Sequence, residues 1–153
     1  MTGCKAVVFH KGQEVIGKGA PVKSLFQVMK GLVSISKVEK GQKRVVEIAK
    51  EGSLLGEVDF LLEAEVSTNE YLAISESVEL YEIEIAYLQI LFFRKPTLAS
   101  KFFRFVSSVL SEKLSNFVSN TVASPDPLQI IESNLSPQQQ ENQQKEKDLS
   151  PEV

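Results

Sequence analysis

The sequence has no tryptophan, one cysteine and one histidine among its 153 residues. The single cysteine, Cys4, cannot form an intramolecular disulfide, which is usual for proteins of a reducing compartment. The single histidine, His10, lies next to Lys11 and far from any acidic cluster. A zinc site or a catalytic pair built on histidine or cysteine is therefore not expected. We expect a cytoplasmic protein that is not an enzyme and that needs no metal or other cofactor.

Long apolar runs are also missing. No segment approaches the roughly 18 apolar residues of a membrane span, and residues 1–5 do not resemble a signal peptide. The formal net charge of −3 gives no indication of nucleic-acid binding. A hydrophobic content of 42% and a charged content of 24% are typical of a soluble globular protein with one domain.

The C-terminal part of the chain is poor in apolar residues. Residues 119–153 are rich in Gln, Glu, Lys and Pro, and residues 124–127 read Ser-Pro-Asp-Pro. Such a segment buries too little apolar surface to offset the entropy lost on ordering. We therefore predict one domain over residues 1–118, followed by a disordered tail over residues 119–153.

Short apolar segments separated by glycine turns dominate the first half of the chain. Residues 32–38 alternate between apolar and polar side chains, as in a strand with one exposed face. We predict that Gly31 forms a tight hairpin turn into this strand. Further strands are predicted over residues 6–9, 14–16, 25–29, 44–49, 71–74 and 78–83. Several short strands at regular spacing predict a β-sandwich or β-barrel.

The hydrophobic pattern changes after residue 84. Residues 85–93 are dense in apolar side chains and predict a helix that Pro96 ends. Thr97 is the predicted N-cap of a long helix that ends near Val118. Its apolar residues form one stripe (Ala99, Phe103, Val106, Leu110, Leu114 and Phe117) beside a second stripe (Phe102, Phe105 and Val109). The second stripe belongs to a wide core face, covers a pocket, or contacts another chain.

Residues 52–62, Gly-Ser-Leu-Leu-Gly-Glu-Val-Asp-Phe-Leu-Leu, combine two glycines with an acid at a predicted helix start. Glycine permits a sharp turn with positive φ, and an acid is favourable at the positive end of a helix dipole. A strand, a glycine turn and a helix N-terminus often hold a phosphate on backbone N–H groups. By itself, the same pattern is also that of a plain strand-to-helix turn.

The order of these segments resembles the cyclic nucleotide-binding domain family. The resemblance is carried by residues 9–16, Gly19, residues 24–31, residues 52–57 and the two predicted helices. It covers roughly residues 6–118 and implies a mainly β fold. The implied architecture is a jelly roll or barrel followed by a short and a long helix that act as a lid.

The resemblance also implies a ligand site. The pair Gly56–Glu57 matches the start of the family's phosphate-binding cassette, in which backbone N–H groups hold the cyclic phosphate. The family's glutamate accepts a hydrogen bond from the ribose 2′-hydroxyl, a role that Glu57 would take. The implied ligand-binding residues are Gly56, Glu57, Val58, Ser67 and Thr68. The purine would stack on one of three phenylalanines of the long helix: Phe102, Phe103 or Phe105.

One element of the family's cassette is missing. Ligand-binding members carry an arginine about nine to ten residues after the glutamate, where this chain has Val66 or Ser67. No Lys or Arg occurs between residues 51 and 84, a window rich in acidic residues. A hydrogen bond to a charged group contributes about 1.5–3 kcal/mol, so its loss weakens binding about tenfold to a hundredfold. A lysine from the first fifty residues could supply the charge, but the sequence does not identify which one.

Two functions are consistent with these observations. The first is a regulatory domain that senses cAMP or cGMP weakly if at all. The alternative is a degenerate jelly-roll scaffold that binds protein partners or self-associates through its long helix. A metal-dependent jelly-roll enzyme is disfavoured, because such sites use several histidines.

Overall fold

The structure is a computed structural model that describes residues 3–122. The chain divides into two compact units, Met1–Val106 and Ser107–Val153. The first unit contains eight strands and two helices, and a third helix begins in the first unit and ends in the second. The predicted tail falls mostly outside the described residues, so the boundary at residue 118 and the disorder of the tail stay predictions.

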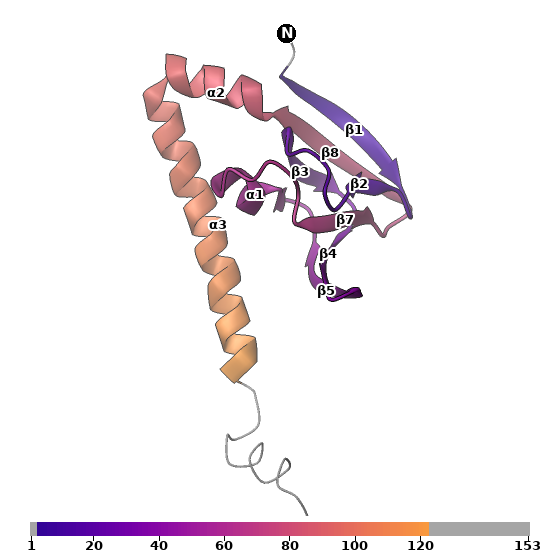
Figure 1. The fold of residues 1–153 in the computed structure, drawn as a ribbon. Helices are drawn as coiled ribbons and strands as arrows, with labels where there is room; N and C mark the ends of the chain where they lie inside the picture. Colours follow the sequence, from indigo (N-terminus) through magenta and orange to yellow (C-terminus); the bar gives the residue numbers. More distant parts are fainter. Residues whose placement is uncertain (1–2, 123–153) are drawn as a thin grey trace, which may run out of the picture. The chain divides into compact units, whose positions relative to one another are not determined.

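Eight strands form two four-stranded antiparallel sheets (Figure 1). The first sheet has the order β1-β8-β3-β6 and consists of Cys4–His10, Ser77–Glu84, Ser24–Lys30 and Leu54–Leu55. The second has the order β2-β7-β4-β5 and consists of Glu14–Ile16, Asn69–Ala73, Val33–Glu39 and Gln42–Ala49. Each predicted strand is found within two residues of its expected bounds, and the mainly β, jelly-roll-like fold is confirmed.

The core is built from side chains of both sheets. It contains Phe26, Val28, Val33, Ile35, Ala49, Leu55, Tyr71, Ala73, Val78 and Leu80. Full burial of a large apolar side chain contributes about 1.5–3 kcal/mol, so this cluster is the main stabilising contribution to the fold. In β8, Val78 and Leu80 are buried and Glu79 is exposed. Because side chains alternate along a strand, Glu82 follows Leu80 on the inner face.

The prediction of a hairpin at Gly31 is wrong. Strand β3 pairs with β6 and β8, whereas β4 pairs with β5 and β7, so the turn is a corner at which the chain changes sheets. Gly31 has φ of +91°, and a Cβ added there would lie 2.5 Å from the carbonyl oxygen of Ser77. The β8 backbone approaches Gly31 so closely that the corner has no room for a side chain at this position. The hydroxyl of Ser75 accepts a hydrogen bond of 2.9 Å from the backbone N–H of Leu32.

Three helices follow or interrupt the strands: α1 (Glu57–Leu61), α2 (Ile85–Arg94) and α3 (Pro96–Val122). The prediction of Thr97 as N-cap is wrong, because α3 begins one residue earlier, at Pro96. Proline is favourable as the first helical residue, since its N–H would have no partner and its φ is already helical. None of the described helices is long and apolar enough to cross a membrane.

Phe60 of α1 packs against the first turns of α3. Its ring centroid lies 6.0 Å from that of Phe102, edge to face, and 6.3 Å from that of Phe103. Phe92 of α2 contacts the same two rings at 5.2 and 5.6 Å. Phe102 of the second predicted stripe is therefore part of a wide packed face, while Phe105 is exposed.

Candidate functional site

The candidate site begins at Gly56, which joins the short strand β6 to helix α1. Strand β6 pairs with β3 through Leu55 and Leu54, and Gly56 then adopts φ of +84°. A side chain at this position would meet no atom closer than 3.6 Å, so its backbone conformation is what requires glycine. The carbonyl oxygen of Gly56 accepts the first bond of the helix, 3.0 Å from the N–H of Phe60.

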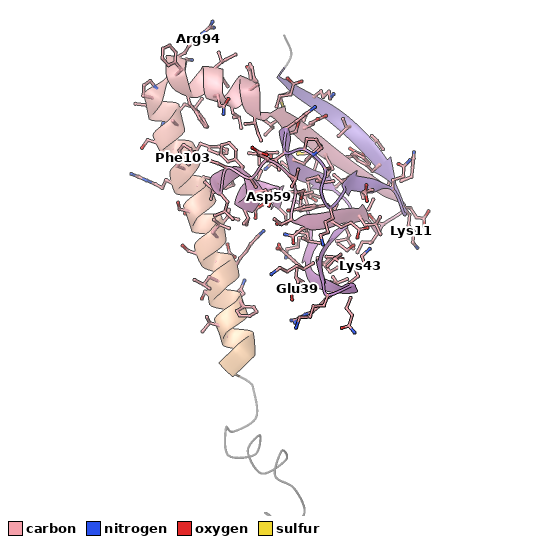
Figure 2. All side chains as sticks on the ribbon, in the orientation of Figure 1. Lys11, Glu39, Lys43, Asp59, Arg94 and Phe103 are labelled. Atoms are coloured by element: carbon pink, nitrogen blue, oxygen red, sulfur yellow. The ribbon has the colours of Figure 1, made fainter. Side chains whose placement is uncertain are left out.

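Asp59 lies at the centre of the hydrogen bonds that close this turn. Its side chain is 1% exposed, and Ser67 is 2% exposed. The Oδ2 atom accepts a hydrogen bond of 2.9 Å from Ser67 Oγ, and Oδ1 accepts one of 2.9 Å from Thr68 Oγ1. Figure 2 shows Asp59 on α1 in the interior, whereas Lys11 and Glu39 lie at the periphery. The carboxylate thus ties α1 to the loop that leads into β7.

The pKa of Tyr71 in β7 reflects the burial and the negative charge of this region. Burial raises the pKa of its hydroxyl to about 12, and the negative charges of Glu57 and Asp59 add to the increase. Hydrogen bonds to the Asn69 side chain and the Gly56 backbone act in the opposite direction. Glu57 is itself 3% exposed. The phenol therefore lies in a closed, negatively charged environment under the start of α1.

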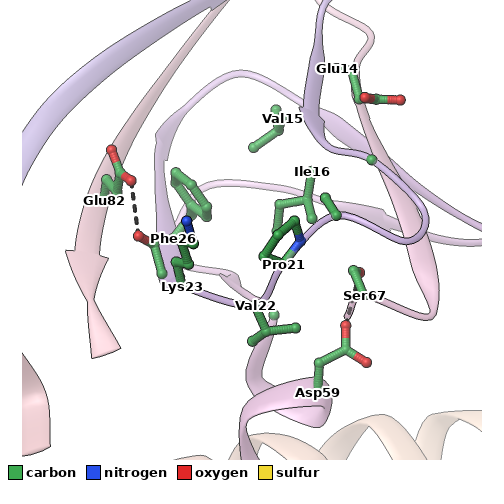
Figure 3. A pocket seen from close by; sticks show the side chains of 14 residues that line it. Glu14, Val15, Ile16, Pro21, Val22, Lys23, Phe26, Asp59, Ser67 and Glu82 are labelled. Atoms are coloured by element: carbon green, nitrogen blue, oxygen red, sulfur yellow. Dashed lines mark hydrogen bonds between the residues drawn. The ribbon is translucent and has the colours of Figure 1, made fainter. Parts of the chain in front are cut away.

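A cavity of about 340 Å³ opens beside Gly56, Asp59 and Ser67 (Figure 3). Most of its wall is apolar and comes from Val15, Ile16, Ala20, Pro21, Val22 and Phe26. Figure 3 shows Asp59 and Ser67 on one side of this wall and Glu82 and Lys23 on the other. Glu82 accepts a hydrogen bond of 2.9 Å from Ser24 Oγ and pairs with Lys5 at 3.2 Å. The arrangement suits a small molecule with an apolar body and polar groups at both ends.

The charged side chains that line the cavity are mainly acidic. They are Glu14, Asp59, Glu82 and Lys23. Lys23 is the only basic residue among those that the structure places on the wall, and it is exposed. It forms no ion pair with any residue in the described part of the chain. Lys23 is thus the candidate for the substitute cation that the sequence could not identify.

The structure brings some of the predicted ligand residues to this cavity and leaves others away from it. Gly56 and Ser67 line the wall, whereas Glu57, Val58 and Thr68 do not. Thr68 donates to Asp59 instead, and Val58 is 38% exposed. Val66 is also exposed and pairs with Pro21 of the cavity wall. An arginine side chain at position 66 would start close to the cavity rim.

The three predicted purine-stacking residues do not line this cavity. Phe103 borders a different cavity of about 590 Å³, together with Phe60 and Phe92. Neither Phe102 nor Phe105 lines the cavity at Asp59. Among the described residues, Phe26 is the aromatic side chain that lines the cavity beside Asp59.

Sequence reasoning missed three residues of the site. Strict alternation from Val78 and Leu80 would have placed Glu82 on the inner face. No comparable signal marks Asp59, since an acid near a helix start is usually an exposed cap. Lys23 belongs to a segment between strands, and only the folded chain shows that it faces the cavity. Within residues 3–122, no group of three or more His, Cys, Asp or Glu side chains is placed to hold a metal ion.

Comparison with known proteins shows the family of the chain. The family model described as "Cyclic nucleotide-binding domain" matches residues 6–95. The chain belongs to the cyclic nucleotide-binding domain family. Domains of this family are regulatory.

Two curated relatives come from Dictyostelium discoideum. Cyclic GMP-binding protein C is 32% identical over 119 residues, and Cyclic GMP-binding protein D is 36% identical over 86 residues. The matches cover 73% and 56% of this chain but only 4% and 6% of those proteins. This cyclic nucleotide-binding domain therefore spans a small part of the length of the relatives that it matches.

Solved structures share the fold at low sequence identity. The c-di-GMP-responsive global regulator CLP of Xanthomonas campestris superposes with a TM-score of 0.70 and 23% identity, covering 81% of this chain and 61% of that chain. The catabolite activator protein of Thermus thermophilus superposes with a TM-score of 0.62 and 20% identity. The match covers 78% of this chain and 56% of that chain. At these identities, the likeness concerns the fold alone.

Proposed function

We propose that this chain is a regulatory domain that senses cAMP or cGMP weakly if at all. The observation that carries the proposal is the buried carboxylate of Asp59, which accepts hydrogen bonds from Ser67 and Thr68. Both hydroxyls were expected to face a nucleotide. They instead donate to an anion that belongs to the protein, so their protons are not available to a ligand phosphate.

The local charge opposes an anionic ligand. Val66 or Ser67 stands where the family resemblance leads us to expect an arginine, and the missing charged hydrogen bond weakens binding about tenfold to a hundredfold. Asp59 places a negative charge at the same wall, and like charges repel strongly where water is excluded. Helix α1 has only five residues, so its dipole offers little compensation. Among the described residues that line the cavity, Lys23 is the one cation, and salt screens an exposed charge.

Titration calorimetry with cAMP and cGMP tests the proposal. We expect wild-type protein to bind either nucleotide with a Kd no tighter than about 100 μM. The double variant Asp59→Ala/Val66→Arg removes the internal anion and restores a cation at an exposed position. We expect it to bind about tenfold to a hundredfold more tightly. The matched control Glu65→Ala/Val66→Arg carries the same arginine but keeps Asp59, so it should gain much less affinity.

Two results would contradict the proposal. Submicromolar binding of either nucleotide to wild-type protein would show that the site needs no arginine. Equal gains in the two double variants would show that Asp59 does not oppose the ligand.

Self-association through α3 is a second candidate function. Leu114 and Phe117 are each 64% exposed and lie one turn apart on the helix, after the partly buried Leu110. Apolar residues at this spacing form a stripe that a second copy of the same helix can cover. Sedimentation velocity of wild type, Leu114→Glu and Phe117→Glu tests it, with Ser115→Glu as the control on the same helix. A dimer lost only in the first two variants supports the candidate, and a wild-type monomer at about 100 μM excludes it.

A further inference from the structure

We propose that the cavity beside Gly56, Asp59 and Ser67 binds an uncharged nucleoside, whose sugar hydroxyl groups donate hydrogen bonds to Asp59. The inference rests on the proposed function, because it assumes that the anionic cyclic nucleotide is not the preferred ligand. It adds a ligand class for the same cavity.

The size and walls of the cavity suit a nucleoside. A volume of about 340 Å³ falls within the usual range for small-molecule sites. Val15, Ile16 and Val22 offer apolar contacts, and Phe26 adds an aromatic ring. A flat base has large apolar faces and polar edges, so it matches a wall that is apolar with polar groups at its ends.

The hydrogen-bonding capacity of Asp59 decides between the two ligand forms. A carboxylate has about four acceptor positions, and Ser67 and Thr68 occupy two of them. The remaining positions accept only from donors. A nucleoside presents its 3′- and 5′-hydroxyls as donors. In a cyclic nucleotide the 3′ and 5′ oxygens are esterified to phosphorus, so only the 2′-hydroxyl can still donate to Asp59, and the phosphate group carries a negative charge.

The buried carboxylate of Asp59 would face the phosphate oxygens of a cyclic nucleotide, which are also acceptors, and it should therefore favour the nucleoside. A cyclic nucleotide offers Asp59 fewer donors than a nucleoside and places an anion beside the carboxylate, where like charges repel strongly because water is excluded. Glu14 on the same wall adds negative charge, whereas the charge of Glu82 is offset by its ion pair with Lys5. We therefore expect a nucleoside to bind at least tenfold more tightly than the corresponding cyclic nucleotide.

The experiment uses the full chain and four named probes. Adenosine, guanosine, cAMP and cGMP are titrated by calorimetry, with ribose as the control for a sugar that lacks a base. Methyl NMR on the same samples locates the binding. We expect a nucleoside to shift the methyl signals of Val15, Ile16 and Val22 and to leave those of Leu114 and Val118 unchanged. Ribose should bind at least tenfold more weakly than the better nucleoside.

A charge-neutral variant tests the role of Asp59. In Asp59→Asn the side-chain amide can donate to a phosphate oxygen, so we expect the preference for nucleoside over cyclic nucleotide to fall at least tenfold. Glu65→Gln removes an exposed charge from the same loop and should keep the preference. The NMR test on wild-type protein does not depend on the folding of either variant.

Three outcomes would overturn the inference. The first is no nucleoside binding at millimolar concentration, and the second is binding that leaves the Val15, Ile16 and Val22 methyls unchanged. The third is an unchanged preference in folded Asp59→Asn. In all three, weak cyclic nucleotide binding leaves the proposed function intact. Tight wild-type binding of cAMP or cGMP overturns both.

Discussion

The hydroxyl of Ser67 donates a hydrogen bond of 2.9 Å to the carboxylate of Asp59, and both side chains are almost fully buried. The same hydroxyl lies 3.0 Å from the carbonyl oxygen of Asn69. Since a hydroxyl has one proton, it donates to one of these acceptors at a time. Thr68 binds the other carboxylate oxygen. Asp59 therefore joins α1 to the segment before β7 through two separate donors.

The replacement Asp59→Ala should lower the free energy of unfolding by about 1–3 kcal/mol. It removes the acceptor for Thr68 and the charged acceptor for Ser67, and it leaves a small void beside Ser67. Urea unfolding followed by circular dichroism measures the change.

The matched control for this variant is Glu65→Ala, which removes an exposed acid from the same loop. Its effect should stay within about 0.5 kcal/mol, as is usual for surface substitutions. If Asp59→Ala were as stable as Glu65→Ala, the two hydroxyl bonds would not hold the cassette.

Gly31 and Gly12 form a matched pair for a test of the corner between the sheets. Both have positive φ, +91° and +87°. An added Cβ at Gly31 would lie 2.5 Å from the Ser77 carbonyl oxygen, whereas at Gly12 it would meet nothing within 4 Å. We expect Gly12→Ala to lower the free energy of unfolding by about 1–2 kcal/mol, which is the usual cost of the left-handed conformation for a residue with a side chain. Gly31→Ala should cost more, because the β8 backbone must also move. Thermal unfolding compares them, and equal costs would argue against the close approach at the corner.

Phe60 contacts Phe102 and Phe103, so the replacement Phe60→Ala should lower the free energy of unfolding substantially. Each aromatic pair contributes about 0.5–1.5 kcal/mol beyond burial, so we expect a total loss of about 2–4 kcal/mol. Phe93→Ala is the control, since its ring is 89% exposed and should cost little. Urea unfolding of both variants checks the difference. A Phe60→Ala protein as stable as Phe93→Ala would mean that the rings contribute nothing to stability.

Much of the fold could be predicted because its signals are local. Alternation and glycine turns located the strands, and the period change after residue 84 located α2 and most of α3. Sheet pairing is not local, which explains the error at Gly31. A glycine with positive φ suits both a hairpin and a corner, and only the distant contact with Ser77 distinguishes them.

The candidate site was predicted in part for the same reason. The backbone turn at Gly56 follows from its neighbours in sequence, and the missing arginine could be counted along the chain. Asp59 and its donors Ser67 and Thr68 are separated by a loop, and Lys23 reaches the cavity from another part of the chain. Whether an acid is exposed or buried against a hydroxyl depends on such distant pairs. Composition and spacing do not contain them.

The raised pKa of the Tyr71 hydroxyl predicts that the protein loses stability in strong alkali. Its pKa is about 10 in an unfolded chain and is raised to about 12 in the folded protein, first by burial and then by Glu57 and Asp59. Between these values the unfolded state releases the phenol proton and the folded state retains it. The unfolded state then binds fewer protons, so the free energy of unfolding falls as pH rises. Below pH 10 both states are protonated and the full contribution is present. Above it, the loss should approach about 1.4 kcal/mol per pH unit until pH 12.

Denaturant unfolding between pH 9 and 12 measures this slope in wild type and in Tyr71→Phe. The variant loses the hydroxyl and its hydrogen bonds, so it should be less stable at pH 9, but this part of its alkaline slope should vanish. Tyr81→Phe, at a position 41% exposed, is the control and should keep the slope, because Tyr71 remains. Asp59→Asn should lower the pH at which the alkaline loss levels off, since it removes one of the two charges that raise the folded pKa. An alkaline slope that is the same in wild type and Tyr71→Phe would show that the phenol does not titrate in the closed, acidic environment described for it.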